Sequence, residues 1–217
     1  MVITNSMEEW SVQFKEIAQD YRIFGPIRQS NKGAFSDTDL IAYGEVLTVE
    51  DIVWSEKSFF SPKEVFYPIR ETLFRFVDGE ANVPPINTKP ILLLLRPCDL
   101  NGIDRLDAIF LRNGLEEDYY YSRRRELLKF AIMACETGFD SCFCASMGSA
   151  DVHENYEIAL WPTIDGMKIQ VASEDFQRYF NTTKDSLIES FPLAPIENIT
   201  KVTIPNFEGI PLEAIFN

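Results

Sequence analysis

The stretch that decides the fold is Ile91-Leu92-Leu93-Leu94-Leu95-Arg96-Pro97-Cys98-Asp99. Its first five residues are apolar without alternation, which predicts a strand buried on both faces, as in a parallel sheet. A second run of this kind, residues 130–134, leads directly to Cys135. Between the two runs, helical spacing of apolar residues predicts a helix over 100–111, and a charged helix is expected over 118–129. This order of strand, helices and strand predicts a βαβ crossover.

The patterns outside this stretch add a helix before it and a β-hairpin after it. Apolar residues at spacings of three and four predict an amphipathic helix over 7–22, which Gly25-Pro26 is expected to stop. Alternating residues in 156–161 and 167–171 predict the hairpin. The predicted fold class is therefore α/β (or α+β), with a mostly parallel central sheet, flanking helices and an added β-hairpin.

Three further segments have weaker patterns. A helix is predicted over 59–76, beginning at Ser61-Pro62 and kinked at Pro68. Residues 78–89 are predicted to be a surface connection, and 173–190 a helix. The domain prediction is a single domain over 1–190, followed by a tail or linker over 191–217.

Length and composition limit the function classes. The chain has 217 residues with a net charge of −14, and an acidic excess of this size argues against binding to nucleic acid or to an anionic membrane. Residues 1–10 are polar and do not resemble a signal peptide. No apolar run reaches the roughly 18 residues that a transmembrane helix needs. These features predict a cytoplasmic protein without a membrane partner.

The four cysteines carry the strongest chemical signal. Their spacing is Cys98-x36-Cys135-x6-Cys142-x-Cys144, and two of them, Cys98 and Cys135, lie within three residues of the ends of the predicted buried strands. Four thiolates are the ligand set of an iron–sulfur cluster and also of structural zinc. The spacing matches neither the usual ferredoxin run nor paired zinc knuckles. Buried unpaired thiols and a dithiol redox pair therefore stay open as alternatives.

The arginines and the histidine carry weaker signals than the cysteines. Arg96 and the run 123–125 are near the cysteines in the sequence, and cations beside a cluster raise its reduction potential. The alternative is that 123–125 form a solvated helix face. His153 is the one histidine and lies in a polar loop, so it is not expected to be a ligand. No catalytic residue is predicted.

The motifs resemble one known family, the A subunit of the anaerobic sulfite reductase, with part of the pattern shared by beta subunits of soluble sulfhydrogenases. The residues that carry the resemblance are Ser61-Pro62-Lys63-Glu64-Val65-Phe66 with Glu71-Thr72-Leu73-Phe74, Leu95-Arg96-Pro97-Cys98-Asp99-Leu100-Asn101-Gly102-Ile103 with Arg105-Leu106-Asp107, Asp118-Tyr119-Tyr120 with Arg123-Arg124, and Cys142-Phe143-Cys144-Ala145-Ser146-Met147-Gly148. The resemblance covers about 43–171.

The resemblance implies an iron–sulfur electron carrier that does no substrate chemistry itself. It would work between a flavin-containing, NADH-oxidising subunit and a sirohaem-containing catalytic subunit that reduces sulfite to sulfide. Cys98, Cys135, Cys142 and Cys144 fall on the family's motif positions, which implies that they hold a [4Fe-4S] cluster. Members of this family continue into a ferredoxin-like domain, which the sequence does not contain.

Three other readings stay open. One is a metal-free structural adaptor of the same complex, with the aromatic run 119–121 as its contact surface. Another is a zinc domain. The last is a beta subunit of a sulfhydrogenase-like enzyme.

Overall fold

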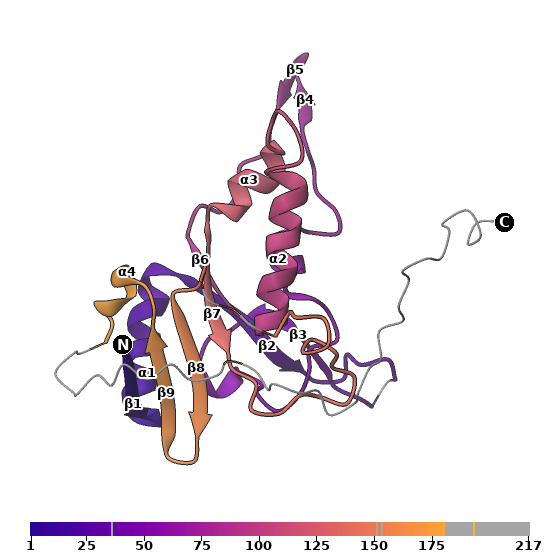
Figure 1. The fold of residues 1–217 in the computed structure, drawn as a ribbon. Helices are drawn as coiled ribbons and strands as arrows, with labels where there is room; N and C mark the ends of the chain where they lie inside the picture. Colours follow the sequence, from indigo (N-terminus) through magenta and orange to yellow (C-terminus); the bar gives the residue numbers. More distant parts are fainter. Residues whose placement is uncertain (36, 151, 153, 181–192, 194–217) are drawn as a thin grey trace, which may run out of the picture.

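A seven-stranded mixed sheet forms the centre of the computed structural model, which describes residues 1–35, 37–150, 152, 154–180 and 193 (Figure 1). Its strands are β1 (Val2–Ser6), β2 (Arg22–Gln29), β3 (Leu40–Glu45), β6 (Ile91–Leu95), β7 (Leu128–Met133), β8 (Ile158–Thr163) and β9 (Gly166–Val171), in the spatial order β1-β9-β8-β7-β6-β2-β3. The helices are α1 (Met7–Asp20), α2 (Pro97–Phe110), α3 (Tyr119–Arg125) and α4 (Glu174–Gln177), with 3₁₀ turns at Val49–Asp51 and Pro62–Val65. A separate two-stranded sheet pairs β4 (Arg75–Val77) with β5 (Glu80–Asn82).

The four central strands run parallel, which confirms the predicted fold class. β6 pairs in parallel with β2 on one side and with β7 on the other, and β7 pairs in parallel with β8. The outer pairings, β2 with β3, β8 with β9 and β9 with β1, are antiparallel. The chain crosses from β6 to β7 through α2 and α3, so the predicted βαβ crossover and hairpin are both present.

The strand β6 is buried on both faces, as its continuous apolar sequence predicts. Successive side chains of a strand point to opposite faces, so Leu92 and Leu94 enter one core and Leu93 and Leu95 the other. The first core is covered by α1 and α4, and the second by α2 and α3 (Figure 1). Because helices cover both faces of the sheet, a site can form at the ends of the parallel strands.

Helix α1 begins with the capping pair that its sequence contains. The Glu9 backbone N–H donates to Ser6 Oγ at 3.2 Å, and the Ser6 backbone N–H donates to Glu9 Oε2 at 2.9 Å. Trp10, Phe14 and Ile17 are buried against the sheet, which confirms the predicted amphipathic face.

The predicted stop at Gly25-Pro26 is wrong, because strand β2 runs through both residues. Helix α1 ends earlier, at Asp20, and Tyr21 follows in an extended conformation. The parallel pairing of β2 with β6 covers Arg22 to Phe24 and ends before Pro26. Beyond that point β2 pairs with β3, so the proline removes no donor from the parallel ladder.

The helix predicted over 59–76 is also wrong. A 3₁₀ turn spans Pro62–Val65, and residues 66–74 are not helical. Ile69 is 85% exposed and Phe76 is 71% exposed, so the apolar side chains that suggested a helix stripe contact no core. Pro68 interrupts the hydrogen bonding that a continuous helix would require.

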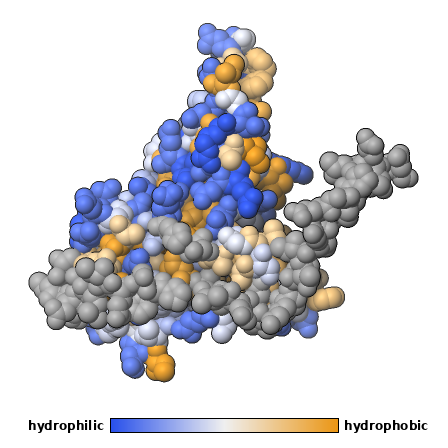
Figure 2. All heavy atoms as spheres, in the orientation of Figure 1, coloured by the Kyte–Doolittle hydropathy of each residue, from blue (hydrophilic) through white to orange (hydrophobic). Residues whose placement is uncertain are grey.

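The surface connection predicted over 78–89 instead begins with a β-hairpin. Asp78 and Gly79 both have positive φ, 53° and 84°, as a two-residue hairpin turn requires. Strands β4 and β5 form an arm that projects away from the main sheet and carries exposed apolar side chains (Figures 1 and 2). The dipeptide Asp78-Gly79 is a local signal from which this hairpin could be predicted.

The end of the chain lies largely outside the described residues. Of the helix predicted over 173–190, α4 covers Glu174–Gln177, and 181–190 falls outside the described part, as does the predicted tail apart from Leu193. Among the described residues, no helix is both long enough and apolar enough to cross a membrane.

Candidate functional site

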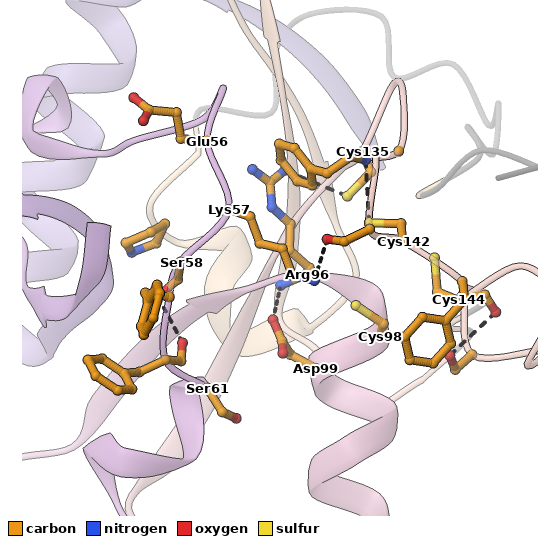
Figure 3. A pocket seen from close by; sticks show the side chains of 18 of the residues that line it. Glu56, Lys57, Ser58, Ser61, Arg96, Cys98, Asp99, Cys135, Cys142 and Cys144 are labelled. Carbon is orange, nitrogen blue, oxygen red and sulfur yellow. Dashed lines mark hydrogen bonds between the residues drawn. The ribbon is translucent and has the colours of Figure 1, made fainter. Parts of the chain in front are cut away.

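All four cysteines line one cavity of about 400 Å³ at the carboxyl edge of the parallel strands (Figure 3). Most of its wall comes from three parts of the chain: residues 56–61, the start of α2, and the loop between β7 and β8. The other residues lining it are Pro26, Tyr43, Glu56, Lys57, Ser58, Phe59, Phe60, Ser61, Arg96, Asp99, Gly138, Phe139, Ser141, Phe143 and Ser149. The predicted gathering of the cysteines at the strand ends is therefore present.

The parallel sheet explains why Cys98 and Cys135 meet. Leu95 at the end of β6 is in register with Ile132 near the end of β7, so the residues that follow both strands emerge at one edge. Cys98 lies in the first turn of α2, and Cys135 comes two residues after β7. The Cys135 backbone N–H donates to the Leu193 carbonyl at 2.9 Å, which fixes the chain at this point.

The loop that carries the other two cysteines is folded by its own hydrogen bonds. The Cys142 backbone N–H donates to the Phe139 carbonyl at 2.8 Å. The Phe139 backbone N–H donates to Cys142 Sγ at 3.4 Å. The Ser149 backbone N–H donates to the Cys144 carbonyl at 2.9 Å. The side chain of Asn101 on α2 donates to the Ser149 carbonyl at 3.1 Å and so ties the loop to the helix that carries Cys98.

Arg96 connects the segments at the centre of the site. Its guanidinium donates to the Trp54 carbonyl at 2.5 Å, to the Ala134 carbonyl at 3.0 Å and to Cys135 Sγ at 3.7 Å. Figure 3 shows Arg96 beside the labelled cysteines, which lie together on one side of the pocket. The cation predicted near the cysteines is therefore in contact with one of them.

Burial raises the pKa of two of the four thiols, those of Cys98 and Cys135. Burial, reinforced by Asp99 and by the other three thiols, raises the pKa of the Cys98 thiol to about 12, although its side chain opens onto the cavity. Burial also raises the pKa of Cys135, and Arg96 opposes that shift. None of the four cysteines, all of which the structure describes, forms a disulfide. Binding a metal here would release protons, since thiolates are the ligating form.

The donor set fits an iron–sulfur cluster in kind and in number. One thiol from the start of α2 and three from the loop between β7 and β8 share a cavity that is also lined by aromatic side chains. In the part of the chain that the structure describes, no three His, Cys, Asp or Glu side chains are arranged to hold a metal ion. The thiols therefore share one cavity without converging as ligands, and their role as ligands stays a prediction.

The arginines of α3 do not reach the site, and they do not form a solvated face either. Arg123 and Arg124 both pair with Glu71, at 2.9 Å and 2.5 Å, and Arg125 pairs with Asp107 at 3.0 Å. These pairs are largely buried and fasten α3 to the base of the arm and to α2. Sequence proximity to the cysteines was misleading here.

The aromatic run and the histidine named in the sequence have different outcomes. Of the aromatic run 119–121, Tyr119 is exposed, but Tyr121 is buried and donates to Asp107 Oδ1 at 2.6 Å, so it cannot be a surface contact. His153 lies outside the described residues.

The cavity also contains residues that the sequence did not single out. The Tyr43 hydroxyl donates to Asp99 Oδ2 at 3.5 Å, and Lys57 Nζ donates to Ser141 Oγ at 3.4 Å. Burial, with Asp99 beside it, raises the pKa of Tyr43 well above its usual value. Asp99 adjoins Cys98 in the sequence and belongs to the motif quoted above. Tyr43 and Lys57 lie more than 40 residues earlier and carry no local signal.

Comparison with known proteins gives one informative relative. No family model matches the chain, and no solved structure matches it. Over 160 residues, 74% of its length, the chain is 27% identical to sulfhydrogenase 2 subunit beta of Pyrococcus furiosus. It spans 45% of that relative's length. The similarity to sulfhydrogenase beta subunits that the motifs predicted is thereby confirmed, and the sulfite reductase A subunit stays a prediction.

Proposed function

We propose that the chain is an iron–sulfur electron-transfer subunit of a cytoplasmic anaerobic sulfite reductase complex. The single observation that carries this proposal is the gathering of all four cysteines around one cavity at the sheet edge. Such an edge is where open α/β sheets usually bind their ligands. The similarity to a protein named as a sulfhydrogenase subunit supports a role as one part of a larger redox enzyme.

The four cysteines would supply the ligands of a [4Fe-4S] cluster. Such a cluster takes up and gives back one electron at a time without making or breaking bonds in a substrate. Tyr43 and Phe139 would line the cluster on its apolar side, while Asn101 holds the loop that bears Cys144 against α2. The chain itself would catalyse no chemical step.

The proposed partners follow from the family resemblance. A flavin-containing, NADH-oxidising subunit would supply the electrons, and a sirohaem-containing catalytic subunit would receive them and reduce sulfite to sulfide. No nucleic acid or membrane partner is proposed. Isolation of the native complex with identification of its subunits and prosthetic groups tests this assignment.

A second candidate is the beta subunit of a sulfhydrogenase-like enzyme, and the measured similarity favours it. The two candidates share the electron relay and differ in the catalytic subunit beside it. The native complex separates them: NADH oxidation that depends on sulfite selects the sulfite reductase, and hydrogen uptake without sulfite reduction selects the sulfhydrogenase.

A third candidate is the metal-free adaptor. It is favoured because, among the described residues, the four thiols share a cavity but are not arranged as the ligands of one metal site. An adaptor keeps its fold and its partners when the cysteines are replaced. A cluster protein loses its iron under the same change.

Metal analysis of anaerobically reconstituted protein tests the proposal against the adaptor and the zinc domain. The expected result is about four iron atoms and a similar amount of acid-labile sulfide per chain, as a cubane cluster requires. Replacement of Cys98 or Cys135 by Ala is expected to remove most of the iron. Ser141→Ala, in the same cavity wall, is the matched control and should keep it. One zinc per chain selects the zinc domain, and no bound metal selects the adaptor.

A further inference from the structure

The guanidinium of Arg96 is held rigidly at the point where three segments of the site meet. It donates to two backbone carbonyls, those of Trp54 and Ala134, and its Cζ lies 5.5 Å from the centroid of the Phe139 ring. Arg96 is the N-cap residue of α2, and its backbone N–H donates to Asp99 Oδ2 at 3.4 Å. These contacts leave the side chain little freedom to turn away from the cavity.

The same guanidinium points one N–H at a sulfur. Arg96 Nη1 lies 3.7 Å from Cys135 Sγ, within hydrogen-bond distance for sulfur. Among the described residues, the acceptors recorded for this guanidinium are two neutral carbonyl oxygens and this sulfur, and none is a carboxylate. The guanidinium therefore makes a direct hydrogen bond to Cys135, while its charge acts on the Asp99 carboxylate without a direct ion pair.

We infer that Arg96 is a positioning residue that sets the reduction potential of the cluster through its hydrogen bond to Cys135. This inference rests on the proposed function. A cluster with four thiolate ligands becomes more negative when it gains an electron, so a cation and an N–H donor at one ligand stabilise the reduced form more than the oxidised form. The half-buried setting strengthens the effect, because charges interact more strongly away from bulk water.

Lys57 provides an internal comparison for this role. It lines the same cavity and carries the same charge, but its Nζ donates to Ser141 Oγ and its side chain is exposed. An exposed cation is screened by solvent and salt and acts weakly on a group that it does not touch. Removal of the charge at Lys57 should therefore change the potential much less than removal of the charge at Arg96.

Redox titration of the reconstituted 217-residue chain tests the inference, with iron content measured on every sample. Arg96→Gln is expected to keep its iron and to shift the midpoint potential in the negative direction, whereas Lys57→Gln should stay close to the unmodified protein. Arg96→Lys retains the charge but not the planar fork that reaches both carbonyls and the sulfur, so an intermediate potential is expected.

The outcomes separate the inference from the proposed function. An iron-loaded Arg96→Gln protein with an unchanged potential, or with the same shift as Lys57→Gln, overturns the inference alone. If Arg96→Gln fails to fold, Arg96→Lys decides, and a potential equal to that of the unmodified protein overturns the inference. An unmodified protein that takes up no iron overturns the proposed function and, with it, this role of Arg96.

Discussion

The side chain of Asn101 donates a hydrogen bond to the backbone carbonyl of Ser149, 48 residues later in the chain. It also donates to the Pro97 carbonyl at 3.2 Å, within its own helix. The Ser149 backbone N–H in turn donates a hydrogen bond to the Cys144 carbonyl. The side-chain amide of Asn101 therefore connects the helix that carries Cys98 with the loop that carries Cys144. The distance between the two cysteine-bearing segments therefore depends on Asn101.

Replacement of Asn101 by Ala should loosen the loop around Cys144. The loss of one hydrogen bond to a half-buried carbonyl costs about 1 kcal/mol, which corresponds to roughly fivefold faster local opening. Hydrogen exchange of the backbone amides in 142–149 measures this change. Asn113→Ala, at an exposed position beyond the end of α2, is the control and should leave their exchange unchanged. Equal exchange in both variants would show that Asn101 does not hold the loop.

Replacement of Tyr121 by Phe should destabilise the fold by about 1.5–3 kcal/mol, the range for a hydrogen bond to a charged group. The Tyr121 hydroxyl donates to Asp107 Oδ1 at 2.6 Å, and both side chains are buried between α2 and α3. Chemical unfolding of the two proteins measures the difference. Tyr119→Phe changes an exposed hydroxyl and should leave the stability within about 0.5 kcal/mol. A neutral result at Tyr121 contradicts the assigned hydrogen bond.

Glu71 should make the stability depend on pH in the acid range. Burial alone would raise the pKa of Glu71, but hydrogen bonds from Arg124 and Arg123 outweigh it and lower the pKa from its usual 4.5. A carboxyl whose pKa falls on folding stabilises the protein above its unfolded pKa, and this contribution is lost as the pH falls through the folded pKa. Glu71→Gln should therefore cost about 1 kcal/mol at neutral pH and progressively less below pH 4.5.

Unfolding curves between neutral and acid pH check this expectation for Glu71. Glu64→Gln removes an exposed carboxylate of the same region and should show no such trend. A difference between the Glu71 variant and the unmodified protein that grows toward low pH would have the wrong sign for the assigned ion pairs.

Leu93→Ala tests the central strand. Leu93 is fully buried and belongs to the core under α2 and α3, so its truncation should cost about 2–5 kcal/mol. Leu115 is fully exposed, and the same truncation there should be nearly neutral. Unfolding in urea compares the two variants, and equal losses would contradict the placement of β6 at the centre of the sheet.

The elements that the sequence predicted well are those with strong local patterns. The unbroken apolar run Ile91–Leu95 predicted a strand at the centre of a parallel sheet, where both of its faces are buried. The capping pair of Ser6 and Glu9 predicted the start of α1. The two strand ends then placed Cys98 and Cys135 at one edge, because parallel strands share their direction.

The elements that the sequence missed depend on long-range contacts. Strand β1 pairs with β9 across most of the chain, and no local pattern indicates this partner. Strand β2 passes through Gly25-Pro26, which is tolerated because of where its pairing with β6 ends. Arg96 was predicted to lie near the cysteines, but its bonds to Trp54 and Cys135 follow from tertiary packing.

The most direct test of the central claim is an anaerobic absorption spectrum of the reconstituted chain before and after reduction with dithionite. We expect a broad shoulder at about 400 nm that bleaches on reduction, as thiolate-bound iron–sulfur clusters show. The Cys98→Ala protein should lack this shoulder, and the Ser141→Ala protein should retain it. A spectrum without the shoulder in the fully folded, unmodified protein would contradict the account and leave a cysteine-lined cavity that carries no electrons.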